Sequence, residues 1–139
     1  MAELTLEDWR RMVDGKLPAL FGIEPIEIEH GHVVLRLDIR PEFLAPNGYL
    51  HAGTVVTLAD TACGIGSRAS LPEGATGFTT IELKANFLRT AREGNGLRCE
   101  GRLVHDGRTT QVWDATVTRE DDGKDLALFR ATQYMLQRE

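Results

Sequence analysis

A single acidic residue stands inside a long run of small and apolar residues, and it is the residue in this sequence with the clearest chemical potential. Asp60 lies between Ala59 and Thr61, in a run from Asn47 to Ser67 that contains no other carboxylate. Burying a carboxylate costs free energy unless the group is paired or used in chemistry. We therefore regard Asp60 as a candidate catalytic residue. A hydrogen-bonding role across a dimer interface is the alternative.

The run opens with a turn signal and continues as a helix. Pro46-Asn47-Gly48 predicts a turn, and residues 51–70 predict one long helix. On a helical wheel one apolar stripe should face a sheet: Val55, Leu58, Ala59, Ala62, Ile65 and Ala69. Asp60 shares another sector with mostly small residues, namely Gly53, Val56, Cys63, Gly64 and Ser67. Small residues permit close approach, so we expect this sector to face a second chain or a ligand channel.

The start of this helix provides a second chemical group. The backbone N–H groups near Ala52 and Gly53 have no partner within the helix and carry the positive end of its dipole. They suit a carbonyl oxygen that becomes negative during acyl transfer. His51 and Asp60 are nine residues apart, about half a turn out of phase, so they cannot pair on one helix face. The simplest site joins Asp60 of one subunit to the helix start of its partner.

The remaining elements are predicted to form the frame around this helix. Thr5 is a suitable N-cap for a short amphipathic helix over residues 5–19. Alternating residues predict strands at 23–28, 33–39, 78–88, 96–105, 109–119 and 126–136, with turns at Gly31, Asp106-Gly107 and Glu120 to Gly123. One long helix must bury its stripe on the sheet. We therefore predict a single α+β domain over residues 1–139, with an antiparallel sheet wrapped around one central helix.

Composition excludes some classes of function. The net charge of −5 argues against a nucleic-acid partner, and the chain shows neither a signal-peptide pattern nor a membrane-length apolar run. We expect a cytoplasmic protein in which Cys63 and Cys99 are reduced. The four histidines, His30, His32, His51 and His105, show no metal-ligand spacing. His30-Gly31-His32 is better interpreted as a hairpin turn, so we expect no metal.

The pattern around the helix resembles a known family. The matching residues are Gly48-x-x-His51-x-Gly53, Leu58-Ala59-Asp60-Thr61-Ala62, Phe87-Leu88-Arg89 and His105-Asp106-Gly107-Arg108-Thr109. Together they resemble the hotdog-fold acyl-CoA thioesterases of the PaaI type, also called 4-hydroxybenzoyl-CoA thioesterase-type. The resemblance implies a hotdog fold, a homodimer or a homotetramer of paired dimers, and a site between subunits. It also implies hydrolysis of an acyl-CoA to free acid and CoA, with no cofactor beyond the coenzyme A of the substrate.

The resemblance also implies roles for individual residues. Asp60 would act as general base on a water, or as a nucleophile through a mixed anhydride. The Ala52 N–H, where the family usually has Gly, would polarise the thioester carbonyl, with Gly53 leaving room for substrate. His51 would brace the loop and Thr80 would help to position water. Three basic residues could meet the phosphates of coenzyme A, namely Arg89, Arg108 and, as a weaker candidate, Lys84.

One position departs from the family pattern, and it keeps alternatives open. Many relatives carry Asn or Gln six residues before the motif His, where this chain has Ala45. Asn47 is the nearest amide, so either it substitutes through a shifted loop or the site lacks this group. The alternatives are a hotdog dehydratase or hydratase, a non-catalytic acyl-CoA binding module, and an oligomerising domain without a ligand. The helix before Leu20 is first a packing element, although it could also roof an acyl pocket.

Overall fold

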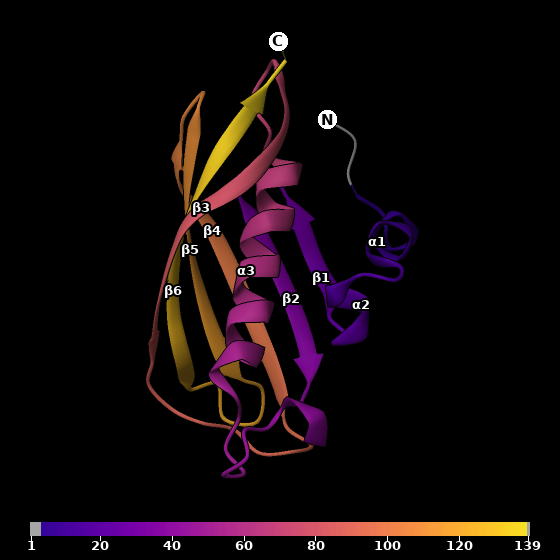
Figure 1. The fold of residues 1–139 in the computed structure, drawn as a ribbon, viewed down its shortest axis with the longest axis vertical. Helices are drawn as coiled ribbons and strands as arrows, with labels where there is room; N and C mark the ends of the chain where they lie inside the picture. Colours follow the sequence, from indigo (N-terminus) through magenta and orange to yellow (C-terminus); the bar gives the residue numbers. More distant parts are fainter. Residues whose placement is uncertain (1–3, 139) are drawn as a thin grey trace.

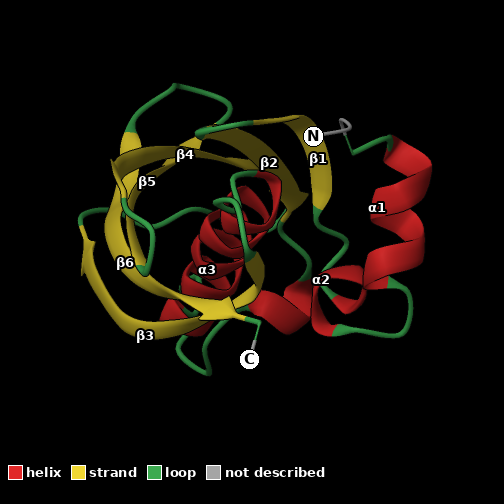
Figure 2. Ribbon diagram, turned by 90° about the horizontal axis from the view of Figure 1, so that it is seen from above, coloured by secondary structure: helices red, strands yellow, loops and turns green. Residues whose placement is uncertain are grey.

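A curved antiparallel sheet wraps around one long helix in the computed structural model, which describes residues 4–138 (Figures 1 and 2). The sheet has six strands in the order β1-β2-β4-β5-β6-β3. Their bounds are Glu24–Glu29 (β1), His32–Asp38 (β2), Ala75–Phe87 (β3), Gly96–Asp106 (β4), Thr110–Arg119 (β5) and Asp125–Gln137 (β6). The helices are Leu6–Val13 (α1), Leu17–Leu20 (α2) and Ala52–Ala69 (α3), with a short 3-10 helix at Pro41–Phe43 (η1). The predicted α+β arrangement is confirmed.

The central helix α3 contacts all six strands, because the sheet curls around it (Figure 2). The predicted stripe is confirmed at Leu58, Ala59 and Ala62, which are fully buried. The wheel was wrong for Cys63 and Ser67, which are also fully buried inside their own protomer. A flat sheet covers one side of a helix, whereas this curled sheet covers more of its circumference. Two residues of the expected small-residue face therefore belong to the core.

The N-terminal segment forms two helices where the sequence predicted one over residues 5–19. Thr5 is the N-cap of α1, and its side chain and that of Asp8 form a capping box. The helix ends at Val13 because Gly15 adopts a left-handed φ of 69°. Pro18 then lies in the first turn of α2, where its missing N–H costs nothing. The two short helices pack beside β1 and α3 (Figure 2).

The strand β3 forms one edge of the sheet and is paired only with β6 among residues 4–138. It begins at Ala75, three residues before its predicted start. Its register with β6 shifts between Thr80 and Glu82, which marks a β-bulge. A bulge reverses which side chains face each side of a sheet. None of the helices in the described part of the chain is long and apolar enough to cross a membrane.

Candidate active site

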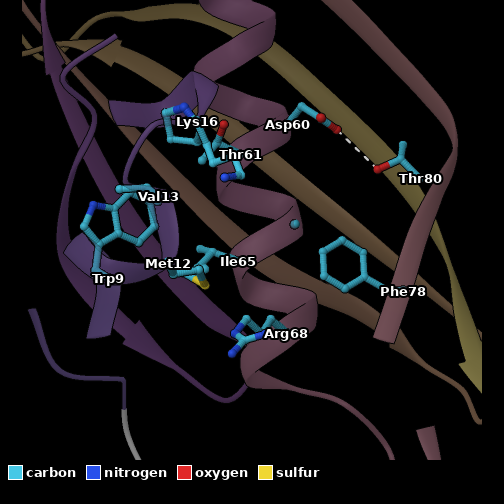
Figure 3. Close-up of a pocket in the computed structure, with 12 residues that line it drawn as sticks. Trp9, Met12, Val13, Lys16, Asp60, Thr61, Ile65, Arg68, Phe78 and Thr80 are labelled. Carbon is cyan, nitrogen blue, oxygen red and sulfur yellow. Dashed lines mark hydrogen bonds between the residues drawn. The ribbon is translucent and has the colours of Figure 1, made fainter. Parts of the chain in front are cut away.

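Asp60 faces a cavity between α3, the N-terminal helices and β3 (Figure 3). The cavity has a volume of about 390 Å³. Its wall is mostly apolar, and the larger side chains that line it are Trp9, Met12, Val13, Ile65 and Phe78. Asp60 is half-buried there, between full solvent exposure and the core. Asp60 therefore faces a cavity formed within a single protomer, where the sequence predicted a second chain or a ligand channel.

The electrostatic state of Asp60 follows from this position. Burial raises the pKa of Asp60, because the charged carboxylate loses contact with water, and a hydrogen bond from the Thr80 hydroxyl partly lowers it again. Two exposed cations, Lys16 and Arg68, line the same cavity. Within residues 4–138 neither forms a salt bridge with Asp60. Asp60 is therefore a weakly solvated carboxylate with one neutral donor, which suits proton transfer.

Thr80 is the predicted site residue that the structure joins directly to Asp60. Its Oγ1 lies 3.4 Å from Oδ1 of Asp60 (Figure 3). The same oxygen lies 2.8 Å from Oε1 of Gln133 on β6. The bulge that follows Thr80 lets the first part of β3 direct Phe78 and Thr80 toward α3. A sheet residue thus reaches the middle of the helix face that carries Asp60.

The start of α3 is held by His51, which is its N-cap. Nδ1 of His51 accepts a hydrogen bond of 2.7 Å from the Gly53 N–H, so the neutral ring carries its proton on Nε2. The Thr54 N–H donates to the His51 carbonyl oxygen at 3.0 Å. Among residues 4–138 no acceptor is found for the Ala52 N–H, and Ala52 is exposed. Of the N–H groups of Ala52, Gly53 and Thr54, that of Ala52 is the one left for an external oxygen.

The loop before α3 uses Asn47 as a turn residue. Its Oδ1 accepts a hydrogen bond of 3.2 Å from the Tyr49 N–H, and Gly48 adopts a φ of 86° that favours glycine. The loop is closed by a hydrogen bond of 2.7 Å from the Ala45 N–H to the Tyr49 carbonyl oxygen. The amide oxygen of Asn47 is therefore engaged locally, and its Nδ2 is the part that remains for a substrate.

The two halves of the expected site are separated within one protomer. Ala52 and Asp60 are eight residues apart on α3, a rise of roughly 12 Å. A thioester carbonyl carbon and a water molecule cannot bridge both groups over that distance. A single protomer therefore does not bring the Ala52 N–H and the Asp60 carboxylate to one substrate carbonyl.

The three basic candidates do not lie together. Arg89 follows β3 near the start of α3, and its Nη1 donates to the Asp125 carbonyl oxygen at 2.6 Å. Arg108 lies in the turn between β4 and β5, at the opposite end of the sheet. Lys84 lies beside Asp114 and Arg130 in a separate surface hollow on the sheet. One protomer therefore cannot bring all three to one coenzyme A molecule.

Several cavity residues were not predicted as site residues from the sequence. Phe78 and Arg68 line the cavity without any local signal in the sequence, because strand pairing and helix packing place them. The same holds for Gln133, which lies outside the cavity lining and contacts Thr80. Trp9 and Met12 do line the cavity beside Asp60, so the N-terminal helix forms part of its wall. Cys63 lies one turn from Asp60, and burial raises the pKa of its thiol well above the ordinary value. Burial therefore disfavours the thiolate form that a nucleophile would need.

A second cluster lies on the outer strands. His32 Nε2 is 2.8 Å from Glu100, and its Nδ1 is 3.6 Å from Glu27 and 3.4 Å from Glu29. Ligand atoms of His32, Glu27 and Glu29 lie within 4.8 Å of one another, a spacing that could hold a metal ion. The sequence had indicated only a hairpin at this point, and Gly31 does form that turn with a φ of 76°. Exposed acidic groups commonly cluster without an ion.

Comparison with known proteins identifies the family. Residues 47–125 match the Thioesterase superfamily. The chain is 34% identical over 116 residues to the 1,4-dihydroxy-2-naphthoyl-CoA hydrolase of Listeria monocytogenes, which covers 84% of this chain and 92% of that protein. It is 26% identical over 115 residues to the acyl-coenzyme A thioesterase PaaI of Escherichia coli, covering 83% and 79% respectively. This chain belongs to the thioesterase superfamily.

Solved structures agree with this assignment. A mutant thioesterase from Pseudomonas aeruginosa has a TM-score of 0.88 and 26% identity, covering 96% of this chain and 95% of that one. A hypothetical thioesterase with coenzyme A from Streptococcus pneumoniae has a TM-score of 0.81 and 25% identity, covering 94% and 99%. The fold is the hotdog, and the chain is a thioester hydrolase of the PaaI-like type.

Proposed function

We propose that this protein hydrolyses an acyl-CoA to a free acid and coenzyme A, with Asp60 as the catalytic carboxylate. The observation that carries the proposal is the position of Asp60: a half-buried carboxylate, held by a neutral hydroxyl, facing a mostly apolar cavity of about 390 Å³. The names of two relatives, a 1,4-dihydroxy-2-naphthoyl-CoA hydrolase and an acyl-coenzyme A thioesterase, support a CoA ester as the substrate.

Asp60 has two routes to the same products. As general base, its carboxylate takes a proton from water, the water oxygen bonds to the carbonyl carbon, and the carbon–sulfur bond breaks. The protonated carboxyl then returns its proton to the thiolate of coenzyme A. As nucleophile, its oxygen displaces the thiolate to form a mixed anhydride, which water then hydrolyses. Burial raises the pKa of Asp60, which makes it a stronger base than an exposed aspartate in either route.

The Ala52 N–H would stabilise the negative charge that develops on the carbonyl oxygen. It lies at the positive end of α3 and has no acceptor within residues 4–138. His51 supports this role indirectly, because its cap on the Gly53 N–H fixes the first turn. Gly53 is required for that cap, since a Cβ there would lie 2.9 Å from Nδ1 of His51. A donor held in place before reaction contributes more than one that must reorient.

We place the complete site between two copies of the chain. The rise of roughly 12 Å from Ala52 to Asp60 supports this placement, because one protomer does not bring the two groups together. The edge strand β3 offers a dimerisation surface, because its outer edge has no strand partner among residues 4–138 and it exposes Ile81, Leu83 and Phe87. Long apolar edge strands pair readily with another chain. A homotetramer would form if two dimers built on this surface associate.

The cavity would hold the acyl group, and basic residues would meet the phosphates of coenzyme A. Trp9, Met12 and Phe78 offer apolar and aromatic surface to an acyl chain or ring. Arg89 is the strongest of the three phosphate candidates, because it lies at the same end of the sheet as the start of α3. Arg108 and Lys84 would contribute only if another protomer brings them near.

A cytoplasmic location without a metal or prosthetic group remains part of the proposal. Both cysteines are free, buried thiols, which suits a reducing compartment. Water, a carboxylate and an amide donor suffice for the reaction as written, so the chemistry requires no further group.

Thiol release from a panel of short, long and aromatic acyl-CoAs tests the function. Asp60→Asn keeps the shape of the side chain and removes the base, so we expect turnover to fall by about 10²–10⁴-fold with folding intact. Asp121→Asn is a matched control, because Asp121 is an exposed carboxylate in the turn between β5 and β6, outside both the cavity and β3, and it should keep normal turnover. Near-normal turnover by the Asp60→Asn variant would remove Asp60 from the mechanism.

A further inference from the structure

A fully buried glutamine stands behind the Thr80 hydroxyl. Gln133 on β6 is 0% exposed and lies directly opposite Thr80 in the β3–β6 register. Its Oε1 is 2.8 Å from Thr80 Oγ1. Its Nε2 is buried and has no hydrogen-bond partner among residues 4–138. An unpaired buried amide nitrogen is costly, so its position next to the Asp60 contact requires an explanation.

The Thr80 hydroxyl has one proton and two acceptors within reach. Oε1 of Gln133 lies at 2.8 Å and Oδ1 of Asp60 at 3.4 Å. If the proton points to Gln133, Asp60 loses the donor and the amide nitrogen of Gln133 stays unpaired. If the Gln133 amide is turned over, its nitrogen donates to Thr80 Oγ1, and the Thr80 proton is free for Asp60. The two ends of an amide have nearly the same size, so hydrogen bonding decides between these orientations.

We propose that Gln133 is a positioning residue whose side-chain amide donates to Thr80 Oγ1 and so directs the Thr80 hydroxyl proton to Asp60. The turned amide leaves a buried carbonyl oxygen without a donor in place of an unpaired NH₂ group, which is the less costly of the two. The hydrogen bonds then run in one direction, from Gln133 through Thr80 to the carboxylate. This inference rests on the proposed function only in giving Asp60 a catalytic role.

Among the groups around Asp60, the Thr80 hydroxyl is the hydrogen-bond donor that affects its pKa. The charged groups that line the cavity are Lys16, from the segment between α1 and α2, and Arg68, from α3. Neither contributes to the shift in the pKa of Asp60, which burial raises and the Thr80 hydrogen bond lowers. From the next helical turn Cys63 is a neutral thiol, because burial raises its pKa well above the ordinary value. Strand β3 supplies Phe78 and Thr80 to this cavity, both uncharged.

The test follows the titration of the Asp60 carboxyl carbon by ¹³C NMR in the full-length protein. In Gln133→Met, which keeps the length but cannot donate, we expect Asp60 to titrate at higher pH than in the wild type. Thr80→Val should give a shift in the same direction. In the double variant Gln133→Met should add nothing to Thr80→Val, because Gln133 acts through the hydroxyl that is already missing. An additive shift, or a wild-type titration in Gln133→Met, would overturn the proposal.

A buried glutamine on the next strand provides a matched control. Gln111 is also 0% exposed and pairs with Gln133 across β5 and β6. Its side chain contacts the Ser70 carbonyl oxygen, Asp106 and Trp113 rather than Thr80. Gln111→Met should lower stability and leave the pH at which Asp60 titrates unchanged. A merely structural role for Gln133 would make the two glutamine variants behave alike.

Two further measurements separate this inference from folding defects and from the proposed function. In the wild type, the Nε2 protons of Gln133 should change chemical shift as Asp60 titrates, and this response should vanish in Thr80→Val. A constant shift in the wild type would contradict the proposal even if Gln133→Met does not fold. In kinetics, Gln133→Met should move the acidic limb of the kcat/KM profile to higher pH. If Asp60→Asn retains full thiol release, the proposed function fails, while the NMR titrations still decide the role of Gln133.

Discussion

Gly66 offers a sharp test of how α3 is seated in the sheet. A Cβ at this position would lie 2.5 Å from Cη2 and 2.6 Å from Cζ3 of Trp113. The indole cannot move away easily, because Trp113 is 0% exposed and its Nε1 donates to Gln111 Oε1 at 3.0 Å. The change Gly66→Ala therefore forces a methyl group into a filled part of the core.

The expected magnitude is the difference between two effects. Overpacking of a core costs about 1–3 kcal/mol, and a contact as short as 2.5 Å against a fixed ring belongs at the upper end. Replacing Gly by Ala inside a helix contributes about 1 kcal/mol in the opposite direction. The net loss for Gly66→Ala is therefore about 2 kcal/mol. For a chain of this length that lowers Tm by about 8 °C.

Gly64→Ala is the matched control for this substitution. It lies on the same helix, and its Cβ would lie 3.4 Å from Cζ of Phe78, close to ordinary contact. This variant should keep most of the gain in helix propensity, so the two variants should differ by about 3 kcal/mol. The assay is urea unfolding at one protein concentration, because association changes apparent stability. Equal stability of the two variants would refute the described packing of α3 against β5.

Three other predictions concern titration and capping. Burial raises the pKa of Asp60 above 3.8, so the folded state binds this proton more tightly and the group lowers stability as pH rises through its titration. Asp60→Asn should remove that loss in unfolding experiments from pH 3 upward. An unchanged dependence of stability on pH would contradict this prediction. His51→Ala removes the N-cap of α3, which should lower the free energy of unfolding by about 0.5–2 kcal/mol and also lower thiol release. Unchanged stability and unchanged thiol release would count against the role of His51 as a cap. The hydrogen bond with Glu100 raises the pKa of His32 above 6.5, and that with His32 lowers the pKa of Glu100 below 4.5. The stabilisation from His32 is present below pH 6.5 and lost as pH rises, while that from Glu100 is present above pH 4.5 and lost as pH falls. Glu100→Gln should therefore destabilise the protein more at pH 6 than at pH 8.5 in thermal unfolding. An equal effect at the two pH values would exclude the pairing of His32 with Glu100.

The long helix and the turns could be predicted from the sequence because short-range physics decides them. The helix predicted over residues 51–70 is observed at Ala52–Ala69, with His51 as its cap. The turn at Gly31 was also predicted, because a left-handed conformation strongly favours glycine. The isolation of Asp60 among small residues was sufficient to nominate it. Each of these signals acts over a few residues along the chain.

The N-terminal segment shows that local stop signals override apolar spacing. Asp14-Gly15 and Pro18 mark a stop and a new start, yet the apolar spacing predicted one helix over residues 5–19. The structure ends α1 at Val13. Leu17 and Leu20 continue the apolar spacing across the break, but both are exposed, so the spacing does not mark one continuous buried face.

Only the tertiary structure decided what surrounds Asp60. Thr80 reaches it because a bulge shifts the register of β3, and Gln133 stands behind Thr80 because β3 and β6 pair across more than fifty residues of sequence. Cys63 is buried because the sheet curls around α3, which a helical wheel cannot show. The sequence by itself therefore determined the helix, its cap and the candidate carboxylate, since these depend on neighbours along the chain. The partners of that carboxylate depend on strand register and sheet curvature, which are set by packing across the whole domain.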